Sequence, residues 1–255
     1  MLHAADVLPG RTVNLFSRWA TAIAGSFEET RYYLRRKDIV LTGMPIRRRL
    51  AGASRDSRTH PLDSDRLTIL VMGGSQGAHS LNETVTSALC ECYEAGHRLR
   101  VIHLAGAADC DRVRQQYAES GMPVEVHGFV QDMAEVYMQT DLAVCRSGAG
   151  SCAELSAFGV PALLIPYPHA TKDHQTANAR AMEKLGAADV VPQLDLSVEW
   201  LKDYIGQCIQ SPDRLARMSA ATRKRARESG AEALADLVER VATGRPEPEP
   251  AVVAP

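Results

Sequence analysis

From residue 67 onward, short strand-like runs alternate with longer segments of helical spacing. Six such runs of four to six residues recur along this part of the chain, at 67–72, 99–104, 124–127, 141–145, 161–165 and 188–191. The segments between them place apolar residues three and four positions apart, which predicts helices. Strands that alternate with helices indicate βαβ units and a parallel sheet covered on both faces. We therefore predict an α/β fold with a doubly wound, Rossmann-like parallel sheet.

The segment before residue 44 is shorter and less regular. We predict two helices and two short strands there: a helix at 11–20, a strand at 21–25, a short helix capped by Ser26, and a strand at 38–42. Two short strands cannot build an independent domain. Residues 1–43 are therefore interpreted as the remnant of a second domain. Their apolar side chains are expected to form an exposed surface, around Leu15, Phe16, Trp19 and Val40.

The other segments connect or end these two parts. Residues 44–66 are rich in Arg, Ser, Asp and Gly and are predicted to be a linker. The larger domain is expected to span residues 67–242 and to end in three helices, near 197–210, 212–228 and 230–242. The last helix is expected to cross back to the N-terminal remnant. Residues 243–255 are rich in Pro and Glu and are predicted to be disordered.

Composition narrows the classes of protein to consider. The formal net charge of the 255 residues is −2, which gives no support for a nucleic-acid partner. The N-terminus lacks the pattern of a signal peptide, and no apolar run is long enough to span a membrane. The six cysteines match no zinc spacing. We expect them to be reduced, buried thiols, and the protein to be cytoplasmic.

The stretch from Cys145 to Glu154 carries the strongest chemical signal. An apolar run enters it and a helix-like run leaves it, with two glycines and two serines between. A strand that turns into a helix directs free N–H groups and the positive end of the helix dipole at one point, where phosphate binds well. Ser151 and Glu154 also fit a capping box, in which they only satisfy the helix start. The local sequence leaves both interpretations open.

The other unusual loops also follow strands, on the edge where such sheets bind ligands. Residues 73–77, Gly-Gly-Ser-Gln-Gly, allow close approach of an anion, but they lack the dinucleotide pattern G-x-G-x-x-G, which disfavours a nicotinamide dehydrogenase. The turn at 128–130 is a candidate wall for a flat base, with a core turn as the alternative. Gln175 suits a sugar hydroxyl or a polar helix start equally. Asp109 and Asp111 are interpreted as acids at a helix start rather than metal ligands.

Four motifs together resemble the MurG family of N-acetylglucosaminyltransferases. They are Gly-Gly-Ser-Gln-Gly-Ala at 73–78, Arg-Ser-Gly-Ala at 146–149 with Glu154, Ile-Pro-Tyr-Pro at 165–168, and His-Gln-Thr-Ala-Asn-Ala at 174–179. The resemblance covers about residues 3–242. It implies a GT-B fold, and transfer of N-acetylglucosamine from UDP-N-acetylglucosamine to the lipid-linked acceptor lipid I in peptidoglycan synthesis.

The resemblance also implies a donor site, in which Val130 reads uracil through its backbone and Glu154 holds the ribose. The implied contacts to UDP-N-acetylglucosamine are Arg47, Gly74, Ser75, Gln76, Val130, Ser147, Ala149, Gly150, Ser151, Cys152, Ala153, Glu154 and Gln175. No cofactor and no metal are implied. The enzymes of this family are expected on the cytoplasmic face of the inner membrane, so peripheral membrane association through a partner is expected here.

The sequence departs from the family before residue 44. The family carries its acceptor site, its proposed catalytic base and its membrane-facing patch in an N-terminal domain, of which residues 1–43 resemble only the end. Asp6 stands where the family has Asn. No catalytic residue is therefore assigned, and lipid I would need an absent or separate acceptor domain. Two alternatives remain: a non-catalytic donor-binding subunit, and a UDP-sugar 2-epimerase, for which only Glu154 and His174 are candidates.

Overall fold

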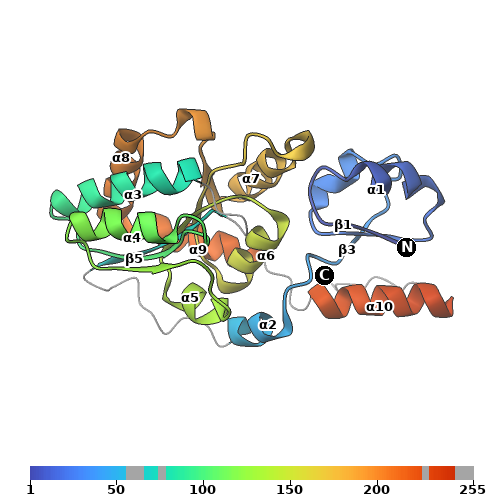
Figure 1. Cartoon of the computed structure of the whole chain (residues 1–255). Coiled ribbons are helices and arrows are strands. Elements are labelled where there is room, and N and C mark those ends of the chain that lie inside the picture. Colours follow the sequence, from blue (N-terminus) through green and yellow to red (C-terminus); the bar gives the residue numbers. More distant parts are fainter. Residues whose placement is uncertain (56–65, 74–78, 226–229, 245–255) are drawn as a thin grey trace. The chain divides into compact units, whose positions relative to one another are not determined.

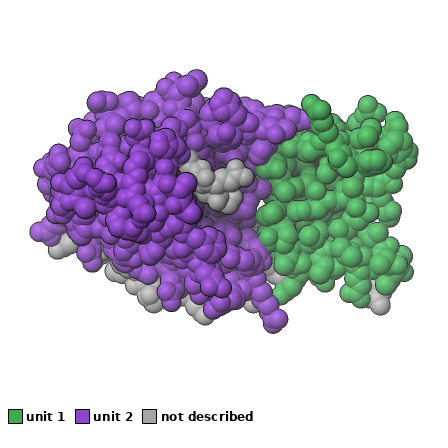
Figure 2. Space-filling model, viewed as in Figure 1, with its two compact units in different colours: residues 1–45, 229–255 green, residues 46–228 purple. Residues whose placement is uncertain are grey.

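The structure, a computed structural model, describes residues 1–55, 66–73, 79–225 and 230–244 (Figure 1). It divides into two compact units, which Figure 2 colours separately. The first unit comprises residues 1–45 and 229–255, and the second comprises residues 46–228. The helix at 230–243, which we expected to cross back to the N-terminal segment, belongs with that segment in the first unit. Most of the predicted disordered tail lies outside the described residues.

A six-stranded parallel sheet forms the centre of the second unit, in the order β6-β5-β4-β7-β8-β9. Its strands are β4 (Leu67–Met72), β5 (Leu99–Leu104), β6 (Val124–His127), β7 (Leu142–Cys145), β8 (Ala162–Leu164) and β9 (Ala188–Val190). Consecutive residues of the central strands, such as Ile69, Leu70 and Val71, are fully buried, so helices cover both faces. All six predicted strands and the predicted fold class are confirmed.

Helices cover the two faces as right-handed crossovers require. On one face α3 (His79–Glu94) packs against α4 (Cys110–Glu119) and α8 (Val198–Gln210). On the other face α6 (Ala149–Phe158) packs against α5 (Met133–Gln139), α7 (His174–Lys184) and α9 (Pro212–Arg225). Two short 3₁₀ turns, η3 (Thr171–Asp173) and η4 (Gln193–Asp195), lie in the loops after β8 and β9.

The predicted linker contains a helix that the sequence pattern did not indicate. Helix α2 (Arg48–Arg55) packs against α5 and α6, and its Leu50 is 2% exposed. The eight residues contain three arginines and only one large apolar residue, and tertiary packing stabilises such a short helix more than propensity does. The linker prediction is therefore wrong for residues 48–55. Residues 56–65 lie outside the described part.

The first unit contains a three-stranded parallel sheet in the order β1-β2-β3. Its elements are β1 (Leu2–Ala4), α1 (Arg11–Phe16), η1 (Ser17–Trp19), β2 (Ile23–Gly25), η2 (Glu28–Tyr32), β3 (Val40–Leu41) and α10 (Gly230–Thr243). Strand β1 was not predicted from the sequence, because three residues are too few to show a period of two. As expected, Leu15, Phe16 and Trp19 are exposed, at 59%, 48% and 61%, whereas Val40 is half-buried.

Ser26 does not cap a helix, which corrects the sequence prediction. The residue at the N-terminal cap of η2 is Phe27, and no side chain caps that turn. The Ser26 hydroxyl instead lies 3.3 Å from the His3 Nε2 atom and donates to the Met44 sulfur at 3.8 Å. His3 belongs to β1, and its burial lowers the pKa of its imidazole. The hydroxyl therefore connects β1 to the chain that follows β3.

A left-handed glycine ends α6 and supports a first testable prediction. Gly159 has φ +64°, and a Cβ there would lie 2.5 Å from Nε of Arg223. Gly121 has φ +68° but open space around it. We expect Gly159→Ala to destabilise the protein by more than the ~1–2 kcal/mol that left-handed strain costs, and Gly121→Ala by that strain alone. Urea unfolding of both variants measures the difference. Equal losses would mean that Arg223 moves aside freely.

Candidate functional site

The carboxyl ends of β4 and β7 mark the expected ligand site. The strand order reverses between these two strands, and open α/β sheets bind ligands at such a switch point. The loop after β4 begins at Gly73, and the loop after β7 comprises residues 146–148. The predicted contacts Gly74, Ser75 and Gln76 lie outside the described residues. The site is therefore built from the β7 loop and the segments around it.

Helix α6 begins with an N-terminus that no side chain caps. Its N-terminal cap is Gly148, and the first N–H within the helix comes from Cys152, which donates to the Gly148 carbonyl at 3.0 Å. The N–H groups of residues 149–151 therefore have no acceptor inside the helix. A Cβ at Gly148 or Gly150 would meet no atom within 4 Å. Open space thus faces the donors and the positive end of the helix dipole, which favours an anion there.

The capping-box interpretation of Ser151 and Glu154 is wrong. Because α6 begins at Ala149, Ser151 is its third residue and Glu154 its sixth, so Glu154 lies in the second turn rather than the first. Glu154 follows Gly150 by four residues, which places both on one face of the helix. Its half-buried carboxylate therefore stands one turn beyond the uncapped N–H groups. Ala153 is also half-buried.

Tyr137 of α5 holds the Glu154 carboxylate. Its hydroxyl donates to Glu154 Oε2 at 2.8 Å, and its ring packs on Phe158 with centroids 5.2 Å apart. Burial raises the pKa of Tyr137 well above its ordinary range, and the charge of Glu154 adds to the rise, whereas the charge of Arg47 opposes it. The predicted contact Arg47, itself exposed, is therefore near this pair. Tyr137 was not among the site residues predicted from the sequence.

The loop after β7 is anchored by the start of α7. The Ser147 hydroxyl donates to the Gln175 carbonyl at 2.8 Å, and Asn178 Nδ2 donates to the Ser147 carbonyl at 3.1 Å. Gln175 Oε1 accepts from the Tyr167 N–H at 2.9 Å. The side chains of Ser147 and Cys152 are fully buried, so they build the loop rather than face the open space. Gln175 is half-buried.

Arg146 adds a buried positive charge at the same edge. It is 6% exposed and donates to the Ile165 and Pro166 carbonyls, at 3.0 and 3.2 Å, and to Gln193 Oε1 at 2.5 Å. Burial lowers the pKa of this guanidinium. No carboxylate among the described residues forms an ion pair with it. Its charge therefore makes this edge of the sheet more attractive to an anion.

The turn predicted to face a base follows β6. Val130 is half-buried, and Phe129 beside it is 79% exposed. A Cβ at Gly128 would lie 3.3 Å from the Ala107 Cα atom, so this turn packs closely on the loop after β5. Asp132 then begins α5 by accepting the Ala134 N–H at 3.2 Å. The turn thus leads directly into the helix that carries Tyr137.

Asp109 belongs to a buried hydrogen-bond network beside the sheet edge. Asn82 Nδ2 donates to Asp109 Oδ2 and to the Ala105 carbonyl, both at 2.9 Å, and Asn82 Oδ1 lies 3.1 Å from His103 Nε2. His79 Nδ1 lies 2.9 Å from Asp109 Oδ1. Asp109 thus joins β5, α3 and α4, as expected of an acid at a helix start. The described residues contain no group of three or more metal-binding side chains.

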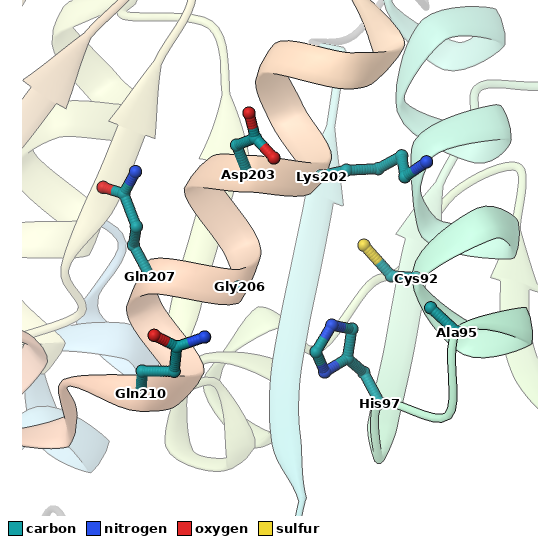
Figure 3. Close-up of a pocket in the computed structure, with 8 residues that line it drawn as sticks. All are labelled: Cys92, Ala95, His97, Lys202, Asp203, Gly206, Gln207 and Gln210. Atoms are coloured by element: carbon teal, nitrogen blue, oxygen red, sulfur yellow. The ribbon is translucent and has the colours of Figure 1, made fainter.

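A pocket of about 350 Å³ lies elsewhere, between α3 and α8 (Figure 3). Its lining comes from the C-terminal part of α3, the turn after it, and α8: Cys92, Ala95, His97, Lys202, Asp203, Gly206, Gln207 and Gln210. Because α3 starts at the carboxyl edge of the sheet, its C-terminal part lies at the opposite edge. Burial raises the pKa of Cys92 to about 11, so this thiol is unreactive. The pocket is separate from the candidate site.

Cysteines of the chain are free thiols. Five of the six are buried, and Cys110 is half-buried. Burial also raises the pKa of Cys145, which ends β7, well above the ordinary range of a thiol. The prediction of buried thiols is confirmed for five of the six cysteines and is wrong for Cys110.

Comparison with known proteins identifies the family. The profile of the glycosyltransferase family 28 C-terminal domain matches residues 68–238, which span the sheet, the β7 loop and α6. The chain belongs to glycosyltransferase family 28. The match includes α5 and α7, which carry Tyr137 and Gln175.

Relatives of known name agree with this assignment. The UDP-N-acetylglucosamine–N-acetylmuramyl-(pentapeptide) pyrophosphoryl-undecaprenol N-acetylglucosamine transferase of Syntrophotalea carbinolica is 40% identical over 242 residues, covering 94% of this chain and 65% of the relative. The crystal structure of MurG from Acinetobacter baumannii matches with a TM-score of 0.78 and 28% identity, covering 94% of this chain and 67% of that one. The chain thus spans about two thirds of the proteins it resembles.

A third similarity concerns the fold alone. The crystal structure of a UDP-N-acetylglucosamine 2-epimerase from Listeria monocytogenes matches with a TM-score of 0.68 at 15% identity, covering 99% of this chain and 69% of that one. This identity is too low to carry chemistry from one protein to the other. It shows that the same architecture occurs in the epimerase class that the sequence analysis kept as an alternative.

Proposed function

We propose that this chain binds UDP-N-acetylglucosamine as the donor-binding half of an N-acetylglucosaminyltransferase. The acceptor in the intact enzyme would be lipid I, the undecaprenyl-pyrophosphoryl-N-acetylmuramoyl-pentapeptide of peptidoglycan synthesis. The donor and acceptor named for the Syntrophotalea carbinolica relative support this assignment. The reaction would take place at the cytoplasmic face of the inner membrane, with membrane contact made through an acceptor domain. No helix of the described residues is long and apolar enough to span a membrane.

The observation that carries the proposal is the position of Glu154 relative to the start of α6. A nucleoside diphosphate joins a dianionic group to a ribose diol through a short link. The uncapped N–H groups of residues 149–151 offer donors to the diphosphate, and the Glu154 carboxylate one turn away offers acceptors to the diol. Arg47 and Gln175 would complete the contacts, and the backbone of Val130 would face the uracil.

The chemistry that follows from this arrangement is stabilisation of a leaving group. In the transfer, an acceptor hydroxyl would attack the anomeric carbon, and the bond from that carbon to the diphosphate would break. Negative charge then grows on the UDP that leaves. Fixed N–H donors and the dipole of α6 would stabilise that charge without reorganising. Among the described residues we assign no base for the acceptor hydroxyl.

Glu154→Gln tests the proposal, because it keeps the size of the side chain and removes its charge. We expect the affinity for UDP to fall by roughly tenfold, about 1.4 kcal/mol, with little change in thermal stability. Calorimetric titration with UDP measures this, and a melting curve provides the stability. An unchanged affinity for UDP would contradict the proposed contact.

Titration with 2′-deoxy-UDP supplies the matched control. The wild-type chain is expected to bind UDP more tightly than 2′-deoxy-UDP or TDP, whereas Glu154→Gln should bind UDP and 2′-deoxy-UDP alike. Equal affinity of the wild-type chain for UDP and 2′-deoxy-UDP would remove the ribose role of Glu154. The epimerase alternative is separated by the product formed in the presence of an acceptor domain: released UDP supports transfer, and a 2-epimerised UDP-sugar supports epimerisation.

A further inference from the structure

Tyr137 directs a buried hydroxyl at the proposed ribose carboxylate. The residue is 1% exposed, and its ring is fixed by packing on Phe158. Its hydroxyl lies 2.8 Å from Glu154 Oε2 and 3.9 Å from the Met72 sulfur. The first of these contacts joins two helices, α5 and α6, between residues 17 positions apart. A rigid donor from one helix therefore sets the orientation of a flexible side chain on the other.

We infer that Tyr137 is a positioning residue, which binds one oxygen of Glu154 so that the other oxygen faces the ribose diol. This inference rests on the proposed function. It adds a determinant of ribose selectivity outside the predicted contacts. The selectivity of the site for a ribonucleotide then depends on a hydroxyl that does not touch the nucleotide.

The chemistry of the two groups fixes the direction of this hydrogen bond. An ionised carboxylate only accepts hydrogen bonds, so the tyrosine hydroxyl must donate. Burial raises the pKa of Tyr137, which keeps the phenol protonated and able to donate over the whole physiological range. The inference requires only that the hydroxyl donate this one hydrogen bond to Glu154 Oε2.

Preorganisation explains why this contact affects affinity. A glutamate on a helix surface has three rotatable side-chain bonds, and ordering them when the ligand arrives weakens binding. Tyr137 orders Glu154 beforehand. A supporting residue of this kind holds a binding group in its productive geometry.

The competing explanation is that Tyr137 only fills the core and satisfies its own hydroxyl. Both explanations predict some loss of stability in Tyr137→Phe, which keeps the ring and removes one oxygen atom. They differ in which of the two nucleotides loses affinity. A core role alone changes the affinities for UDP and 2′-deoxy-UDP equally. A positioning role lowers the affinity for UDP by about fivefold and leaves 2′-deoxy-UDP almost unchanged, because only the ribose contact is lost.

Calorimetric titration of the full chain with both nucleotides tests the inference. In Tyr137→Phe we expect the preference for UDP over 2′-deoxy-UDP to shrink by about fivefold. In the Glu154→Gln background, the same substitution should have no further effect on UDP affinity, because there is no carboxylate to position. An unchanged preference in Tyr137→Phe, or full additivity in the double variant, overturns the inference.

Tyr117→Phe is the matched control. Tyr117 is fully buried, and its hydroxyl also has a side-chain partner, Nδ1 of His103 at 3.0 Å, but it lies on α4 away from Glu154. Tyr117→Phe should lower the stability of the protein without changing the preference for UDP over 2′-deoxy-UDP.

Glu154→Asp is a second test, because it keeps the charge and shortens the side chain away from Tyr137. We expect it to lose the preference as well, and a retained preference would show that charge alone suffices.

These experiments separate the inference from the proposed function. If the wild-type chain does not distinguish UDP from 2′-deoxy-UDP, the ribose role of Glu154 fails and the inference fails with it. If the wild-type chain and Tyr137→Phe distinguish them equally well, the proposed function stands and only the role of Tyr137 is wrong.

Discussion

The second unit is expected to lose about 2 kcal/mol of stability between pH 7.5 and pH 5 through His103 alone. This histidine is fully buried, and its burial lowers the pKa to about 3. The charge of Asp109 raises that pKa, and the charge of Arg112 lowers it. An unfolded chain carries the same histidine with a pKa near 6.5. The two states therefore bind protons at different pH values.

The sign follows from the lower pKa in the folded state. Below about pH 6.5 the unfolded chain takes up a proton that the folded chain refuses, so acid favours unfolding. The stabilisation is complete above that pH and declines steadily as the pH falls towards 3. Over the whole range between the two pKa values, the free energy of unfolding changes by about 5 kcal/mol, which is comparable to the whole stability of many domains.

The hydrogen bonds of His103 agree with a neutral ring. Its Nε2 lies 3.1 Å from Asn82 Oδ1, which can only accept, so Nε2 carries the proton. Its Nδ1 then accepts from the Tyr117 hydroxyl at 3.0 Å. Because Asn82 also donates to Asp109 and to the Ala105 carbonyl, charging the ring would disturb a network that joins β5 to α3 and α4.

Urea unfolding at several pH values, with and without His103→Gln, measures this contribution. Glutamine keeps a donor and an acceptor but does not titrate. The chain has two tryptophans, so Trp19→Phe leaves Trp200, on α8 of the second unit, as the only tryptophan to report unfolding by fluorescence. Between pH 7.5 and pH 5, the free energy of unfolding should fall by about 2 kcal/mol more in the wild-type protein than in His103→Gln. Parallel pH profiles would contradict the prediction.

The sequence predicted the sheet well because its strands are buried on both faces. Runs such as Leu67–Met72 are apolar at nearly every position, which leaves little choice of structure. The sequence pattern did not predict the elements that form through tertiary contacts. Leu2–Ala4 forms a strand by pairing with β2. Helix α2 packs on α5 and α6, with Leu50 buried.

The candidate site was predictable in its location but not in its internal contacts. Glu154 could be found because it follows a glycine-rich turn at the carboxyl end of a strand. The local sequence left its capping role open, and the structure excludes that role because the N-terminal cap of the helix is Gly148, three residues before Ser151. Tyr137 lies in an ordinary apolar helix pattern, and nothing in that pattern shows that its hydroxyl reaches a residue of the next helix.

The other large effect is expected in the rate of N-acetylglucosamine transfer when an acceptor domain is added. The purified chain of 255 residues should bind UDP-N-acetylglucosamine but release no UDP above background when a lipid I analogue is added. Adding a separate acceptor domain should raise turnover on the order of a hundredfold or more, because enzymatic transfer depends on holding donor and acceptor together. Released UDP, followed with a coupled assay, measures both conditions.

The first unit explains why the chain alone is expected to be inactive. Its described residues form a sheet of three strands, each three residues long or shorter, with no glycine-rich loop beside it. Its α1 buries no residue, and Leu15, Phe16 and Trp19 remain exposed nearby. Such a surface needs cover from further protein, which an acceptor domain would provide. Because the described strands of this unit are so short, we expect the chain alone to show no turnover with a lipid-linked acceptor.

Glu154→Gln provides the control for the rescue experiment. If the added domain works with the donor site, turnover in the mixture should fall with the affinity for the donor when Glu154 is replaced. Turnover that is insensitive to this variant would show that the added domain acts alone. Turnover by the wild-type chain without any addition would show that three short strands suffice for the acceptor, and would contradict the view that this chain supplies the donor half of the reaction. Binding without turnover, followed by rescue that depends on Glu154, would place the leaving-group chemistry at the start of α6.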